Sequence, residues 1–192
     1  MKRCEWCTDD KVYMDYHDNE WGKVTTDECE LFEFLILESF QAGLSWLTIL
    51  KKRGNFRRAF DNFDYKKIVE YDDKKFQELM EDKGIIRNKL KIKAAINNAS
   101  KFMEIQNEFG SFYNYLWKFV DGNQIINRPR NMEEFPTRSE LSDKISGDMK
   151  KRGFKFIGTT IIYSYLEAVG VIDDHMEECF LTSPSVRGIS SL

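Results

Sequence analysis

Hydrophobic side chains recur at helical spacing along most of this chain, and that periodicity limits the possible folds more than any other feature. Apolar residues return about every three to four positions, which places them on one face of a helix. No segment shows the alternation of apolar and polar residues, bounded by turns, that is typical of a half-buried strand. The sequence therefore predicts an all-α fold. Residues that commonly cap helices precede several of the periodic segments: Asp27, Ser45, Asp64, and Asp72 or Asp73.

The composition is sufficient for one substantial hydrophobic core. Of the 192 residues, 42% are hydrophobic and 14% aromatic, which can fill one core or two small lobes packed together. We expect residues 1–180 to form a single unit of two packed helical lobes and residues 181–192 to be a flexible tail. Acidic residues interrupt the longest apolar run, LFEFLILESF, and the N-terminus MKRCEWC lacks an apolar signal segment. We therefore expect a cytoplasmic protein with no membrane partner.

The net charge of −3 weighs against a nucleic-acid partner, but the basic residues are unevenly distributed. They are concentrated in KGIIRNKLKIK (83–93) and KKRGFKF (150–156). The second segment belongs to a predicted helix, hairpin and helix within residues 139–170, with Gly153 and Gly158 in the hairpin. Glycine lets two backbones approach closely, and the free amides that begin the second helix carry partial positive charge. The hairpin could hold a phosphate, although an ordinary helical hairpin with solvated lysines fits the same pattern.

The two histidines each lie near a cysteine, at opposite ends of the chain. His17 follows Cys4 by thirteen residues, and His175 precedes Cys179 by four, which is about one helical turn. Four cysteines without a secretory signal favour reduced thiols or metal ligands over disulfides. If the chain ends meet, these residues form a Cys2His2 set, a common tetrahedral zinc shell. Incidental pairs, Cys7 as a rival ligand, and a redox-active pair of Cys4 with Cys7 remain alternatives.

Glu38 shares a helical face with Leu31 and Leu35, so a carboxylate is directed where apolar groups point. A buried carboxylate is costly unless it is paired or hydrogen-bonded. A cluster of aromatic rings around one acid fits a pocket for a flat, cationic ligand. The alternative is that the aromatic residues belong to the core and that Glu38 ends its helix in solvent. The aromatic residues concerned are Tyr13, Tyr16 and Trp46.

Six motifs follow one another in order over about residues 1–180: RCEWC, YMDYHDNEWG, LESFQAGLSWLTILKKR, GIIRNKLKIKAAINNA, KKRGFKFIGTTIIYSYLEAVG and DDH…C. Together they resemble the bacterial 3-methyladenine DNA glycosylase I (Tag) family. An ordered set of this length is far more specific than any one motif. The resemblance implies a helical fold of the helix-hairpin-helix DNA glycosylase superfamily, with the termini joined by a zinc site, and a DNA repair enzyme.

The resemblance also assigns site residues by their positions in these motifs. It implies one structural zinc ion and no organic cofactor, and it leaves Cys7 outside the zinc shell. The implied zinc ligands are Cys4, His17, His175 and Cys179. The implied base pocket contains Glu38, which is also the expected catalytic residue, with Tyr16, Trp46, Tyr13 and Trp6. The DNA-anchoring hairpin falls on 153–158, and we expect DNA-backbone contacts from Lys151, Arg152, Gly153, Lys155, Gly158 and Thr159.

Two features do not follow the family pattern directly. Phe40 stands where many relatives carry a polar residue, so the shape of the pocket at this position stays open. Much of the wider superfamily uses a catalytic aspartate after the hairpin, and this family is described as lacking it. Asp173 and Asp174 nevertheless follow the second hairpin helix in this chain.

The implied reaction is the hydrolytic excision of 3-methyladenine from double-stranded DNA by a monomer without lyase activity, leaving free base and an abasic site. A base alkylated at N3 is cationic, so its glycosidic bond is weak. The enzyme must flip the nucleotide out of the duplex. Glu38 can then accept from the exocyclic amine while Tyr16 and Trp46 stack on the ring. Two other classes remain open: a DNA-binding helix-hairpin-helix module without activity, and a zinc-stabilised helical protein that binds a free purine.

Overall fold

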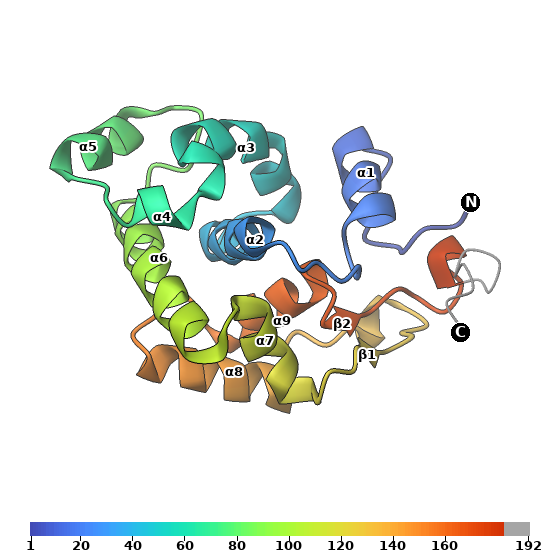
Figure 1. Ribbon diagram of the computed structural model, residues 1–192. Helices are drawn as coiled ribbons and strands as arrows, with labels where there is room; N and C mark the ends of the chain where they lie inside the picture. Colours follow the sequence, from blue (N-terminus) through green and yellow to red (C-terminus); the bar gives the residue numbers. More distant parts are fainter. Residues whose placement is uncertain (183–192) are drawn as a thin grey trace.

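The computed structural model describes residues 1–182 and is mostly helical, which confirms the predicted fold class in outline (Figure 1). Its α-helices are α1 (Lys11–Asn19), α2 (Glu28–Gln41), α3 (Trp46–Ala59), α4 (Tyr65–Ile68), α5 (Asp73–Glu81), α6 (Lys89–Phe109), α7 (Phe112–Trp117), α8 (Glu140–Lys151) and α9 (Thr159–Ala168). Short 3-10 helices are η1 (Asp61–Phe63), η2 (Lys118–Val120), η3 (Met132–Glu134) and η4 (Phe180–Thr182). Of the expected tail, residues 181 and 182 belong to η4, and residues 183–192 lie outside the described part of the chain.

No helix of the described part combines the length and the apolar character that a membrane span requires. The prediction that the chain contains no sheet is wrong in one place. Strand β1 (Ile125–Ile126) pairs in parallel with β2 (Ile172–Asp173), and Ile125 lies opposite Ile172. Strands of two residues are too short to produce an alternating sequence pattern. The pairing ties segment 121–138, which contains two of the three prolines, to the chain that follows α9.

The residues that were predicted to cap helices do so. The side chain of Asp27 accepts from the backbone amide of Glu30 at 2.9 Å, and Ser45 accepts from the amide of Thr48 at 3.2 Å. Asp64 also caps its helix, and Asp72 rather than its neighbour caps α5. These bonds satisfy amides that have no partner within the helix, which is why the helices begin at the predicted places.

Helix α2 runs through the centre of the molecule (Figure 1), and its residues after the first turn are buried up to Phe40. Every residue from Leu31 to Phe40 is buried, which agrees with its nearly continuous apolar sequence. Helices α3, α6, α7 and α9 pack against it. The acidic Glu33 is accommodated because Arg53 and Arg57 donate to it at 2.6 and 2.8 Å. The last turn of α2 therefore carries Glu38 into the interior of the protein.

The two ends of the described chain lie side by side (Figure 1). The amide of Phe180 donates to the carbonyl of Lys2 at 2.8 Å. A second close approach occurs after α9, where Gly170 has a φ of +76° and a Cβ at this position would lie 2.2 Å from the backbone carbon of Lys23. Only glycine can occupy that position without displacing the backbone. The segment after α9 is thereby held against the segment after α1.

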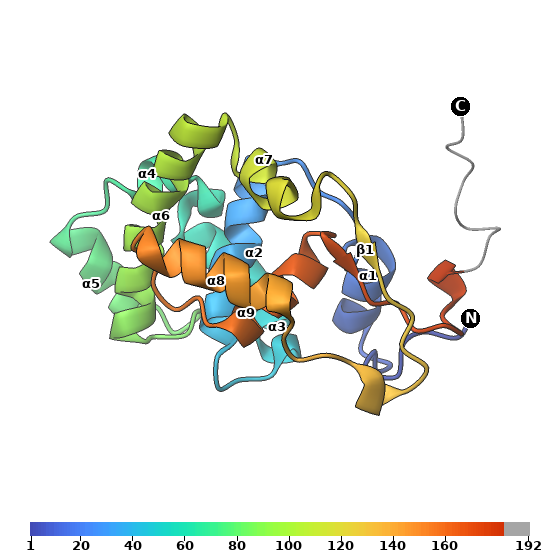
Figure 2. The ribbon, with the colours of Figure 1, turned by 90° about the horizontal axis from the view of Figure 1, so that it is seen from below.

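Helices α8 and α9 form the predicted pair of helices around a glycine turn, and Figure 2 shows α8 beside α9. The turn begins at Gly153, whose φ of +95° is favourable only for glycine. Helix α6 fixes the turn, because Asn98 donates to the carbonyl of Lys155 and accepts from its amide, both at 2.9 Å. Ser146 of α8 donates to the carbonyl of Ile157 at 2.7 Å. The hairpin is therefore a fixed part of the fold.

Candidate functional site

A cavity of about 350 Å³ lies where α1, α2, α3 and α9 meet the segment around η3. This volume falls within the range of small-molecule sites in proteins. All five residues that were predicted for a base pocket lie in its wall. The complete lining is Trp6, Tyr13, Tyr16, Trp21, Glu38, Gln41, Trp46, Met132, Phe135, Ser164 and Glu167.

Aromatic rings form most of the cavity wall. Tyr13 and Tyr16 lie one turn apart on α1, which directs both toward the same side. The rings of Tyr16 and Trp46 are 5.5 Å apart between centroids and cross at 63°. Trp6 and Tyr13 are 5.2 Å apart and cross at 65°. Edge-to-face packing fixes these rings and leaves faces on which a planar ligand can stack.

Glu38 is a buried acid that has no counterion among residues 1–182. Its side chain is 3% exposed, and its Oε2 atom has no hydrogen-bond partner among the described residues. Burial raises the pKa of the Glu38 carboxyl to about 8. The lysine that reaches the end of α2 is directed elsewhere, because Nζ of Lys91 donates to the carbonyls of Phe40 and Ala42 at 2.8 and 2.7 Å. A cationic ligand in the cavity would supply the missing positive charge.

The open question about Phe40 is answered by its position. Its side chain is fully buried and is absent from the cavity wall. It packs edge-to-face on Phe56 at 4.9 Å and on Phe60 at 6.0 Å between ring centroids. Phe40 is therefore a core residue and leaves the shape of the cavity unchanged.

Sequence reasoning missed six residues of the cavity wall. Trp21 lies in the motif YMDYHDNEWG and Gln41 in LESFQAGLSWLTILKKR. Their closeness in sequence to the predicted pocket residues could have identified them. Ser164 and Glu167 lie on the second hairpin helix, which was considered only for its contact with DNA. The remaining two, Met132 and Phe135, belong to segment 121–138, and no sequence pattern connects that segment to the cavity.

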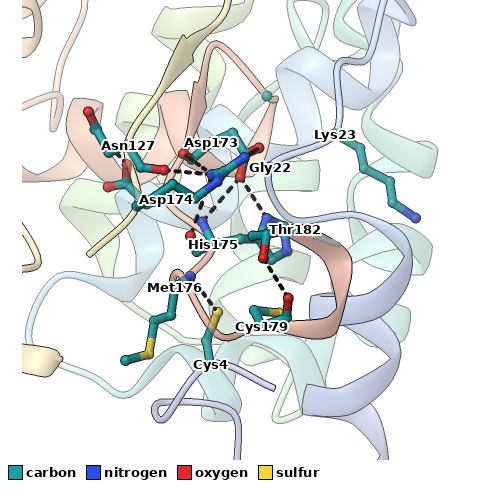
Figure 3. Close-up of polar contacts among 12 residues, drawn as sticks. Cys4, Gly22, Lys23, Asn127, Asp173, Asp174, His175, Met176, Cys179 and Thr182 are labelled. Carbon is teal, nitrogen blue, oxygen red and sulfur yellow. Dashed lines mark hydrogen bonds and ion pairs between the residues drawn. The ribbon is translucent and has the colours of Figure 1, made fainter. Parts of the chain in front are cut away.

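The two ends of the chain bring three of the four predicted metal ligands together. One donor atom each from Cys4, His17 and Cys179 lies within 4.8 Å of the others, and all three residues are buried. His175 is not part of this close group, although its ring centroid lies 5.1 Å from that of His17. Figure 3 shows His175 above the two cysteines, on the segment that follows β2. Cys7 lies outside the group.

The surroundings of both histidines fit metal ligation. Nδ1 of His17 lies 2.8 Å from Asp18, and Nδ1 of His175 lies 2.7 Å from Asp173. Carboxylates at Nδ1 orient metal-binding histidines and direct Nε2 toward the ion. Nε2 of His175 is buried and has no hydrogen-bond partner among the described residues. A hydrogen bond from Cys4 lowers the pKa of the Cys179 thiol, which favours a thiolate there.

Asp173 and Asp174 have structural partners and lie outside the cavity wall. Contacts of Asp173 with the ring of His175 and with Arg128, both at 2.7 Å, hold the pKa of its carboxyl well below its usual range despite burial. Asp174 is fully buried and accepts at 2.7 Å from both Asn127 and the hydroxyl of Tyr163 (Figure 3). The hydrogen bonds of both carboxylates are thus directed to the surrounding protein.

The predicted DNA-contacting residues are gathered on the hairpin, but their side chains differ in availability. Lys151 and Lys155 are exposed, and no ion pair to either is found among the described residues. Arg152 donates to Asp148 at 2.7 Å and to Glu108 at 2.6 Å. Thr159 shares a 2.8 Å hydrogen bond with Ser142. No side chain of the described residues caps the start of α9 at Gly158, so its first amides are free for an anion.

Comparison with known proteins agrees with this arrangement. Residues 6–182 match the methyladenine glycosylase family. The chain belongs to this family. Among family members, DNA-3-methyladenine glycosylase 1 of Escherichia coli (strain K12) is 43% identical over 179 residues, which cover 93% of this chain and 96% of that protein. The resemblance that the six motifs predicted is therefore confirmed.

Solved structures of family members share the fold closely. A crystal structure of 3-methyladenine DNA glycosylase I is 44% identical, covers 93% of this chain and 98% of its own, and gives a TM-score of 0.90. A structure described as the basis of 3-methyladenine recognition by the Staphylococcus aureus enzyme is 36% identical. It covers 93% of this chain and 95% of its own, with a TM-score of 0.89. The methyladenine glycosylase family thus shares both the sequence and the architecture of this chain.

We predict that Glu38→Gln stabilises the fold at alkaline pH. The folded-state pKa of about 8 exceeds the ordinary value of 4.5, so ionisation of Glu38 opposes folding increasingly between these pH values. The variant should unfold at a temperature about 5 °C or more higher at about pH 9, and the gain should be much smaller at about pH 5. Thermal unfolding at both pH values measures this effect.

The matched control for this measurement is Glu33→Gln in the same helix. Its carboxylate is paired with Arg53 and Arg57, so this substitution should lower the unfolding temperature at about pH 9. An equal gain at both pH values for Glu38→Gln would show that the buried charge is not the cause.

Proposed function

We propose that this chain is a DNA glycosylase that excises 3-methyladenine from alkylated DNA. The observation that carries the proposal is Glu38, a buried acid without a counterion in an aromatic cavity. The names of its relatives in Escherichia coli and Haemophilus influenzae, both DNA-3-methyladenine glycosylases, support the same activity. The cavity and the hairpin belong to one chain, so the proposed reaction needs no second subunit, and we expect a monomer. We expect it to act on double-stranded DNA in the bacterial cytoplasm.

The chemistry of the substrate matches the cavity. A deoxynucleotide methylated at adenine N3 carries a positive charge, which attracts an ionised Glu38 and the faces of Tyr16 and Trp46. The uncharged adenine of normal DNA lacks this attraction and leaves the buried carboxylate uncompensated. The nucleotide must leave the base stack to reach the cavity, at a cost of a few kcal/mol. Selection and excision therefore depend on the same contacts.

The reaction that we propose is a simple hydrolysis. The bond between the sugar C1′ and the base nitrogen breaks with its electron pair leaving on the base, which neutralises the cation. Water adds to C1′ and releases one proton to solvent, and an abasic site remains. No lysine lies in the cavity wall formed by the described residues, so a Schiff-base step has no nucleophile there. Borohydride should accordingly trap no covalent complex with DNA.

Release of 3-methyladenine from methylated duplex DNA is the decisive test of this function. The wild-type chain should release the base and leave abasic sites. A chain that binds DNA without releasing base would be a helix-hairpin-helix binding module. A chain that binds free 3-methyladenine but does not act on DNA would be a purine-binding protein.

We further predict that Glu38→Gln lowers excision at least about tenfold, which corresponds to about 1.4 kcal/mol of transition-state stabilisation. Tyr16→Phe keeps its stacking face and should lose less.

The active form of Glu38 is the carboxylate, so kcat/KM should rise with pH through the free-enzyme pKa of about 8. Glu38→Gln should abolish this rising limb. Single-turnover release at wild-type rates by folded Glu38→Gln would exclude the carboxylate as the recognition group.

We propose that the ends of the chain bind one structural zinc ion through Cys4, His17, His175 and Cys179. Two thiolates and two imidazoles would fill a tetrahedral shell and leave no position for water, so the ion would stabilise the fold without taking part in the chemistry. Two observations support this set. Nε2 of His175 is buried without a hydrogen-bond partner among the described residues, and a carboxylate lies at Nδ1 of each histidine. Zinc binding would bring His175 to the other three residues.

Metal analysis and thermal unfolding test the zinc site together. Cys179→Ser should lose most of the bound zinc and lower the unfolding temperature by about 5 °C or more. Cys7→Ser is the matched control and should change neither quantity. Wild-type protein without zinc, or loss of zinc in Cys7→Ser but not in Cys4→Ser, would contradict the assignment.

We propose that the hairpin holds the DNA backbone through the free amides at the start of α9 and through Lys151 and Lys155. Each neutralised phosphate contributes about 0.9 to the slope of log affinity against log salt. Replacing both lysines by alanine should therefore reduce the slope by about 1 to 2. Arg152→Ala should reduce it less, because Asp148 and Glu108 already occupy that guanidinium. An unchanged slope in the double variant would move the DNA contact to the basic segment 83–93.

A further inference from the structure

A second carboxyl group, that of Glu167, lies in the wall of the same cavity as Glu38. Glu167 stands on α9, three residues after Ser164, which also lines the cavity. Helices α2 and α9 pack directly against each other. No lysine, arginine or histidine lies in the cavity wall formed by the described residues. Two ionised carboxylates there would exceed the single positive charge of an alkylated base.

The surroundings of Glu167 favour the protonated form of its carboxyl. Its carboxyl is hydrogen-bonded to Asp174, and two carboxyl groups can share a hydrogen bond only if one of them carries a proton. Asp174 already accepts from Asn127 and from the hydroxyl of Tyr163. Burial raises the pKa of the Glu167 carboxyl well above its usual value, and the charges of Asp174 and Glu38 raise it further, so Glu167 carries the shared proton.

The neutral form of Glu167 has one oxygen available to the cavity. Its hydroxyl donates to Asp174, and its carbonyl oxygen keeps an unused acceptor. This arrangement adds an acceptor to the cavity without adding a charge. The exocyclic amine of adenine has two hydrogens, and a buried donor without an acceptor costs about 1–3 kcal/mol. One acceptor, on Glu38, satisfies only one of them.

We propose that Glu167 is a second base-binding residue that accepts one hydrogen of the exocyclic amine of 3-methyladenine, while Glu38 accepts the other. The inference rests on the proposed glycosylase function. It makes Glu167 a determinant of specificity for alkylated purines that carry an amine at position 6. The chain from the cavity through Glu167 and Asp174 to Asn127 also fixes the orientation of this acceptor.

Two variants and two bases test the proposal. Glu167→Gln keeps the carbonyl acceptor and gives Asp174 an N–H donor, whereas Glu167→Met has similar length without an oxygen. Quenching of tryptophan fluorescence measures affinity, because Trp6, Trp21 and Trp46 line the cavity. The probes are free 3-methyladenine and 3-methylhypoxanthine, which carries an oxygen in place of the amine. Excision of 3-methyladenine from methylated duplex DNA is measured in parallel.

We expect Glu167→Met to lose about tenfold or more in affinity for 3-methyladenine and in excision, and to lose less than about twofold in affinity for 3-methylhypoxanthine. Glu167→Gln should stay within about threefold of wild type for both bases. No loss in Glu167→Met, or equal losses for both bases, would overturn the proposal, since equal losses indicate a general structural effect. Wild-type protein that releases no 3-methyladenine would instead refute the proposed function itself.

A measurement on the wild-type chain keeps the proposal testable if Glu167→Met does not fold. With both amine hydrogens accepted, a purine methylated at both N3 and N6 must leave one acceptor unused. Wild-type protein should bind this base at least about tenfold more weakly than 3-methyladenine. Equal affinity for the two bases would overturn the proposal.

Discussion

The burial of Glu38 without a counterion is the constraint on which the site depends. A carboxyl in a low-dielectric interior prefers its neutral form, and this preference appears as a pKa of about 8. The fold could neutralise the charge with a lysine, yet Lys91 is directed to the carbonyls at the end of α2. In the function that we propose, the positive charge that compensates Glu38 would come from the alkylated base. The contrast with Glu33 is informative, because that carboxylate in the same helix has two arginine partners.

Helix α9 connects the hairpin to the cavity. Its first turn offers free amides beside the hairpin, where a phosphate would bind. Its later turns carry Ser164 and Glu167 into the cavity wall. A single helix thus fixes the distance between the hairpin and the cavity, which in the proposed function is the distance between the DNA backbone and the flipped base. Asn98 of α6 holds the hairpin through both backbone groups of Lys155, so the hairpin itself is also fixed in place.

The junction of the chain ends supports one side of the cavity. Trp6 lies two residues after Cys4, and Tyr16 immediately precedes His17. A metal ion at this junction would therefore fix two aromatic walls of the cavity without contacting the base. Loss of the ion should affect stability first and base binding through these neighbours.

The sequence by itself determined the helical class, the capping residues and the membership of the family, because these depend on local spacing and on ordered motifs. It also singled out Glu38, because an acid on an apolar helical face is visible in the pattern, together with three aromatic residues, and the family resemblance added Trp6. Only the tertiary structure decided that Glu167 shares the cavity with Glu38, that Arg152 is engaged by Asp148 and Glu108, and that Phe40 belongs to the core. Each of these depends on contacts between segments far apart in the chain. Helical periodicity gives the face on which a residue lies, but the packing of that face against distant helices decides which partner it meets.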